Sequence, residues 1–169
     1  MINIGKTSDD FHARFDAKKR TYIYIIKNSE VPLGIEFDNF LWIRSRLNEK
    51  QMNKAAKKLL GEQDFSSFRA SSCQSNNPVR DMIRIELEVD KFISIRFTAN
   101  AFLHHMIRNI VGTLLDVGTE KISPKDLIRI LQAKDRNAAS KTASAEGLYL
   151  ARVNYPEKYA FPYHSNEMI

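Results

Sequence analysis

The sequence predicts an α+β domain with a mostly antiparallel sheet and with helices packed on one face of that sheet. Two observations carry this prediction: apolar side chains that alternate as in strands, and apolar side chains at i, i+3 and i+4 as in helices. A third is the length of 169 residues, which suits one domain over residues 1–169. The expected element order is β, α, β, β, α, α, β.

The first expected strand spans residues 20–27, where β-branched and aromatic residues lie on both faces, as in an interior strand. A helix is expected over residues 48–60, because apolar residues recur at helical spacing with lysines opposite. Asn48 is its expected N-cap, and Gly61 is the residue expected to end it.

An antiparallel hairpin is expected next, with strands over residues 82–90 and 92–98. Alternation in the first of these strands places four apolar side chains on one face. They are Ile83, Ile85, Leu87 and Val89.

The cleanest apolar stripe in the chain predicts a helix over residues 101–117, with Gly118 in the C′ position. A shorter helix is expected from Ser123 to Leu131, because a serine cap, a proline and an acidic residue open it. A last strand is expected over residues 148–154, before a tail that contains proline and tyrosine.

Composition limits the class of protein. Lysine and arginine number 26 against 20 aspartates and glutamates, a net charge of +6 that indicates a polyanionic partner. The single Cys73 excludes an internal disulfide and zinc motifs of paired cysteines. The first residues lack the pattern of a signal peptide, and the most apolar stretch contains histidine and arginine. We therefore expect a cytoplasmic protein without a membrane span.

Three polar clusters are candidates for function. In the first, helical spacing places His104, Arg108 and Gly112 on one face of the helix expected over residues 101–117. A solvated polar face is the alternative interpretation. Because His104 and the adjacent His105 point apart on a helix, they cannot bind one metal together, and we expect no metal site.

The second cluster is Arg20, Tyr22 and Tyr24, which share a face of the first strand because strand side chains repeat every two residues. An arginine beside tyrosines suits phosphate binding and base stacking. The alternative is a buried tyrosine whose hydroxyl bonds the backbone.

The third cluster is a long polar loop expected over residues 61–80. Its Arg69 and Arg80 flank a segment rich in serine, asparagine and glutamine, as in a phosphate-contacting surface. The alternative is structural, with two core anchors and one turn or cap residue. These are Phe65, Phe68 and Asp64.

No cluster combines a nucleophile with a base, and the chain has no glycine-rich phosphate loop. A DNA-binding regulator is disfavoured, because no expected helix carries a continuous basic face. The residues themselves therefore predict a basic α+β domain that binds nucleic acid, and they reveal no reaction.

Five segments, taken in order, resemble the C-terminal half of the bacterial tRNA pseudouridine synthase A family. The most specific are F-L-H-H-M-I-R-N-I-V-G, A-K-D-R and A-E-G-L-Y-L. The resemblance implies isomerisation of uridine to pseudouridine in the anticodon stem-loop of tRNA, without a metal or cofactor. It also implies a homodimer, with each active site in a basic cleft between two α+β halves.

The resemblance implies roles for particular residues. Tyr22 matches a tyrosine that stacks on the target base and is the candidate for proton removal. Arg108 matches an arginine that pairs with the catalytic aspartate and helps displace the base, and Leu148 matches an apolar residue of the uracil pocket. The positions expected near the RNA are Arg14, Arg20, Arg69 and His104.

One departure concerns the catalytic aspartate, which the family carries in the motif G-R-T-D-A-G-V-H-A of its N-terminal half. This sequence has no such motif. We therefore expect a C-terminal half that is inactive alone and whose Arg108 lacks its catalytic partner. The alternative is a stand-alone RNA-binding or dimerisation module without catalysis.

Overall fold

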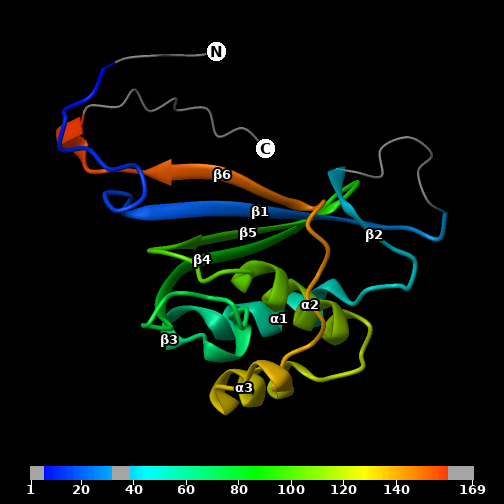
Figure 1. Ribbon diagram of the computed structural model, residues 1–169. Helices are drawn as coiled ribbons and strands as arrows, with labels where there is room; N and C mark the ends of the chain where they lie inside the picture. Colours follow the sequence, from blue (N-terminus) through cyan, green and yellow to red (C-terminus); the bar gives the residue numbers. More distant parts are fainter. Residues whose placement is uncertain (1–5, 32–38, 160–169) are drawn as a thin grey trace.

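In a computed structural model of the protein, which describes residues 6–31 and 39–159, three helices cover one face of a six-stranded sheet (Figure 1). This arrangement confirms the predicted α+β class. The strands are β1 (Lys19–Asn28), β2 (Leu41–Ile43), β3 (Gly61–Asp64), β4 (Val79–Val89), β5 (Ile93–Ala99) and β6 (Leu148–Asn154). The helices are α1 (Glu49–Ala56), α2 (Met106–Gly118) and α3 (Pro124–Ala133). The end of the predicted tail, residues 160–169, lies outside the described residues.

Strand β1 lies inside the sheet, as its apolar character on both faces predicted. It pairs antiparallel with β5 and β6, and its C-terminal end pairs in parallel with β2. Tyr24 and Ile26 are buried beneath the helices. Strand β2 was not predicted, because three residues are too few to show alternation.

Side-chain caps start α1 and α3 where the sequence predicted. Asn48 accepts a backbone hydrogen bond at the start of α1, and Ser123 and Asp126 form a reciprocal capping box before α3. Helix α1 ends at Ala56, sooner than predicted, because the chain tightens there into a 3-10 turn. Helix α2 includes Gly118 rather than ending before it.

The predicted apolar face of β4 is wrong at its first residue. Met82 and Arg84 pair with successive residues of β5, so Ile83 is the extra residue of a β-bulge. Met82 is therefore buried, whereas Ile83 is 41% exposed. Ile85 is buried as predicted, and Val89 is exposed at the end of the strand.

The helix predicted to begin at residue 101 begins at Met106, so the prediction is wrong over its first turn. His105 has a φ of 59°, a left-handed conformation that is not helical. The backbone carbonyl of His104 accepts a hydrogen bond from another segment of the chain instead of a helical one. His104 therefore does not share a helix face with Arg108 and Gly112.

The prediction of one continuous loop over residues 61–80 is wrong. The first four of these residues form β3, and the last two already belong to β4. The structural alternative for Phe65, Phe68 and Asp64 is confirmed. Both rings are buried in the core, and the carboxylate accepts hydrogen bonds from the backbone and hydroxyl of Ser66.

Candidate functional site

Two adjoining hollows lie beside the first half of β1, where the segment between β5 and α2 approaches it. The larger hollow has a volume of about 710 Å³ and the smaller one about 400 Å³. They share five lining residues, which makes them two parts of one site. The shared residues are Arg14, Tyr22, Phe102, Leu103 and His104.

Tyr22 is half-buried and lines both hollows. Phe102 packs against it edge to face, with ring centroids 5.2 Å apart and an interplanar angle of 85°. Within residues 6–31 and 39–159, no group hydrogen-bonds the Tyr22 hydroxyl. The Tyr24 hydroxyl instead donates to the carbonyl of Ser144 at 2.7 Å, and burial raises the pKa of Tyr24. The structural interpretation of this cluster is therefore confirmed for Tyr24 but does not describe Tyr22.

Arg108 extends from the first turns of α2 into the smaller hollow. Its Nε donates to the carbonyl of Ala143 at 2.7 Å, and its Nη1 lies 3.4 Å from Nε2 of His105. Burial, with the charges of His104 and Arg108, holds the pKa of His105 below its usual value. The neutral imidazole can accept the bond from Nη1. Nη2 has no hydrogen-bond partner among the described residues and is available to an anion.

Leu148 is the first residue of β6 and lines the smaller hollow together with Tyr22 and Arg108. Its side chain is half-buried and packs against the core. Strand β6 runs antiparallel to β1, which sets Leu148 opposite Tyr24. Two strands and one helix thus bring together three residues that lie far apart in the sequence.

Arg20 is less accessible than the sequence predicted. Its Nη1 donates to the carbonyls of Ala17, at 3.3 Å, and Asn100, at 3.0 Å, and its Nη2 donates to the carbonyl of Arg14. Arg20 thereby holds the turn before β1 against the end of β5. Arg14 is exposed and lines both hollows.

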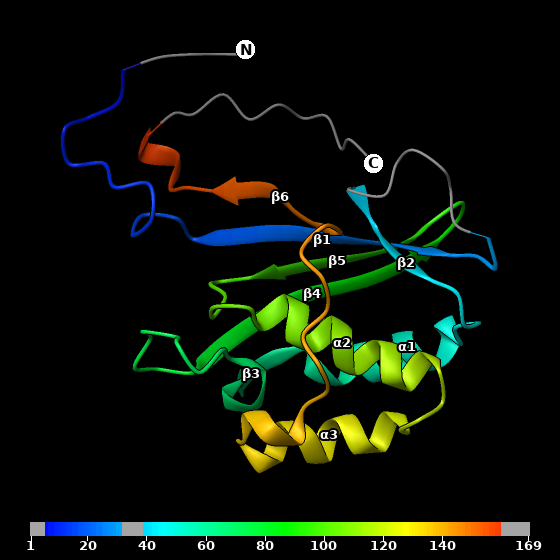
Figure 2. The same cartoon turned by 45° about the vertical axis from the view of Figure 1, so that its right-hand side comes forward.

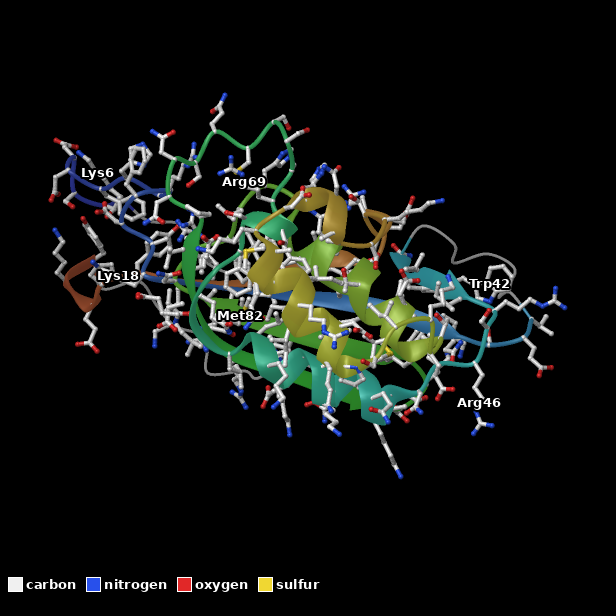
Figure 3. All side chains as sticks on the ribbon, turned by 90° about the horizontal axis from the view of Figure 1, so that it is seen from below. Lys6, Lys18, Trp42, Arg46, Arg69 and Met82 are labelled. Atoms are coloured by element: carbon white, nitrogen blue, oxygen red, sulfur yellow. The ribbon has the colours of Figure 1, made fainter. Side chains whose placement is uncertain are left out.

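Arg69 lies in the segment that leads to β4 (Figure 3) and is not among the described residues that line the two hollows. Its Nη1 is 3.4 Å from the carbonyl of Ser75, which lines the larger hollow. Cys73 also lines the larger hollow. Burial raises the pKa of the Cys73 thiol, but backbone N–H groups of Ser75 and His104 and the charges of two arginines outweigh burial and lower it. This contact between Cys73 and His104 was not predicted, because the two residues lie far apart in the sequence.

The charge around the site is one-sided. Among residues 6–31 and 39–159, six side chains that are cationic or can become cationic line the two hollows, and no aspartate or glutamate does. Such a surface attracts a polyanion and, at Tyr22, offers a ring for stacking. The six are Arg14, Arg20, Arg80, His104, His105 and Arg108.

The described residues contain no group of three or more His, Cys, Asp or Glu side chains that could hold a metal ion. None of their helices is both long enough and apolar enough to cross a membrane.

Two contributions to the site were missed from the sequence. One is Phe102, which packs against the Tyr22 ring. In the sequence it is only an aromatic residue two positions before His104. The backbone carbonyl of Ala143 orients Arg108 from a segment without regular structure, and no pattern in that segment predicts the contact.

A sequence model of a family described as tRNA pseudouridine synthase matches residues 55–156. The tRNA pseudouridine synthase A of Francisella philomiragia subsp. philomiragia is 48% identical over 158 residues, which are 93% of this chain and 61% of that relative. The protein of the same name from Vibrio campbellii is 47% identical over 158 residues, which are 93% of this chain and 60% of the relative. The chain thus spans about three fifths of the length of these curated relatives.

Proposed function

Because the chain belongs to the tRNA pseudouridine synthase family, we propose that it forms one wall of the active site of an isomerase that converts uridine to pseudouridine in tRNA. The observation that carries this proposal is the meeting of Tyr22, Arg108 and Leu148 in one hollow, to which no described residue contributes a carboxylate. An aromatic ring, a guanidinium and an apolar side chain together suit a flipped pyrimidine base beside an anion.

The target base must leave its stack, which costs roughly a few kcal/mol. Stacking on the Tyr22 ring would offset about 1–3 kcal/mol of this cost. The Tyr22 hydroxyl is the group that we propose to remove the proton that the base loses. Leu148 would line the apolar side of the uracil pocket. Arg108, held through Nε, would present Nη2 to the catalytic carboxylate and help displace the base.

The proposed reaction needs a carboxylate, and none of the described residues brings one to the hollows. We propose that residues 1–169 form a C-terminal half, that an N-terminal half supplies the catalytic aspartate, and that this chain alone forms no pseudouridine. A guanidinium beside such a carboxylate would lower its pKa and keep it ionised.

The proposed substrate is the anticodon stem-loop of tRNA, bound by a homodimer in the cytoplasm. The proposed RNA contacts are Arg14 and His104, which line both hollows, and Arg69, which contacts Ser75 of the larger hollow. We propose two roles for Arg20. It would lie near the RNA, and it also fixes the turn that carries Arg14.

We expect a tRNA transcript labelled with tritium at uridine C5 to release no label when mixed with this chain alone. Forming the new glycosidic bond at C5 expels that hydrogen, so released tritium measures turnover. Adding a polypeptide that covers the part of the Francisella philomiragia relative without a counterpart here is expected to restore release.

The full-length relative is the positive control for this assay. Release by the chain alone would contradict the proposed need for an outside carboxylate. Tight tRNA binding without release, even after the added part, would favour the alternative of an RNA-binding or dimerisation module without catalysis.

Binding of tRNA is expected to weaken as salt rises, because each phosphate contact releases counterions. Arg69→Ala is expected to reduce the slope of log K against log salt by about 1. The matched control is Arg129→Ala, which removes an exposed arginine of α3 that is paired with Asp126. Equal slopes for the two variants would contradict a phosphate contact at Arg69. Arg20→Ala is a poorer test, because it would also free the turn before β1.

A further inference from the structure

The irregular segment over residues 139–147, named here the strap, crosses α2 on its way from α3 to β6 (Figure 2). It delivers Leu148 to the smaller hollow, and its Ala143 carbonyl holds Nε of Arg108. The backbone N–H of Ala143 also donates to the carbonyl of Arg108 at 3.1 Å. The strap therefore bonds Arg108 through both the N–H and the carbonyl of Ala143.

A single buried amide fixes the strap beside this contact. The Asn109 side chain is fully buried, and its Oδ1 accepts from the Thr142 hydroxyl at 2.7 Å and from Nη2 of Arg136 at 3.2 Å. Arg136 in turn donates to the carbonyls of Ala139 and Ser140. The first half of the strap is thus tied to one oxygen atom, directly through Thr142 and indirectly through Arg136.

The other end of the same amide holds the segment that precedes Arg69. Nδ2 of Asn109 donates to the carbonyl of Phe68 at 2.8 Å. The next residue is Arg69, one of the proposed RNA contacts. An amide side chain combines an NH2 group, which donates, with an oxygen that can accept two hydrogen bonds. It can therefore hold the strap and the segment of Phe68 at the same time.

Burying an amide costs free energy unless its hydrogen bonds are satisfied, and an apolar side chain would fill an interior helix position at less cost. Its neighbour Arg108 is the residue whose direction matters for the proposed reaction. We propose that Asn109 is a positioning residue, which sets the direction of the Arg108 guanidinium through Thr142 and Ala143 and the place of Arg69 through Phe68. This inference rests on the proposed function for its consequence but not for its geometry.

The test is hydrogen exchange at Nε of Arg108, followed by NMR on the chain labelled with 15N-arginine. Asn109→Ala is expected to speed this exchange by about tenfold or more, because the strap opens without global unfolding. Asn109→Asp keeps the acceptor for Thr142 and Arg136 and is expected to exchange as the unaltered protein does. It loses the donor to Phe68 and sets a carboxylate oxygen beside that carbonyl, whereas the Arg136 guanidinium faces its other oxygen.

The matched control is Ser67→Ala. It removes a buried hydroxyl that donates to the carbonyl of Ile130 at 2.6 Å, away from the strap. A loss of stability by itself would speed Arg108 exchange equally in Ser67→Ala, and that result would overturn the proposal. Unchanged exchange in a folded Asn109→Ala would also overturn it.

If Asn109→Ala does not fold, Thr142→Val decides the question in the same way. It removes one half-buried hydroxyl and leaves Asn109 in place, so faster exchange supports the proposal and unchanged exchange overturns it. Binding of tRNA by the unaltered chain is measured beside it. Failure to bind tRNA would count against the proposed function, while the exchange result would still decide the role of Asn109.

Discussion

Gly112→Ala is expected to lower the free energy of unfolding by about 2 kcal/mol. A Cβ atom at Gly112 would lie 1.9 Å from the backbone oxygen of Lys141 and 3.4 Å from the backbone nitrogen of Ala143. Because backbone atoms obstruct it, the strap must move away from α2. Overpacking of this kind costs about 3 kcal/mol at its upper range, and the better helix propensity of alanine returns about 1 kcal/mol.

Gly118→Ala is the matched control, since it lies on the same helix and is also buried. The added Cβ would meet Sδ of Met52 at 2.6 Å and Cδ2 of Leu47 at 3.0 Å, and both are ends of flexible side chains. We expect a change within about 1 kcal/mol for this variant. Urea unfolding of both variants measures the difference, and equal losses would show that the strap does not lie tightly on Gly112.

Most elements of the fold could be predicted because their signals are local. The strands near Tyr24 and Leu148 and the capped start of α3 at Ser123 each follow from a few neighbouring residues. The bulge at Ile83 could not be predicted, because it depends on the register against β5 and shifts the buried position to Met82.

The start of α2 was predicted too early for a related reason. Apolar spacing continues back from Met106 to Leu103, so the sequence looks helical there. The carbonyl of His104 instead accepts a hydrogen bond from the backbone N–H of Ala70, and His105 adopts a left-handed conformation. A tertiary hydrogen bond and one backbone conformation therefore overrode a helical pattern.

The site itself was predictable only in part. Residue types indicated cations and an aromatic ring near β1 and a polar helix position at Arg108, whereas the role of Arg108 and the choice of Leu148 came from the resemblance alone. The strap carries no periodic signal, because it consists of small and polar residues held by Asn109 and Arg136. Its contacts with Arg108 and Asn109 join segments that lie far apart in the sequence, so no local pattern predicts them.

Tyr22→Phe is expected to slow pseudouridine formation by about 10²–10⁴-fold in the complemented enzyme, the usual loss when a group that transfers a proton is removed. Binding of tRNA is expected to stay nearly unchanged, because the ring and its edge contact with Phe102 remain. Tyr22→Ala would remove the ring as well, so we expect it to weaken binding by about 1–3 kcal/mol.

Tyr24→Phe separates this effect from a loss of structure, because Tyr24 lies two residues away on the same strand. Its hydroxyl bonds only the carbonyl of Ser144 among the described residues, so we expect a loss of about 1 kcal/mol in stability. Because Ser144 belongs to the strap, the rate is expected to fall, but far less than in Tyr22→Phe. Tritium release and tRNA binding are measured for both variants. If Tyr22→Phe released tritium at the unaltered rate, the hydroxyl would not be the proton acceptor, and the role of Tyr22 would be limited to stacking on the base.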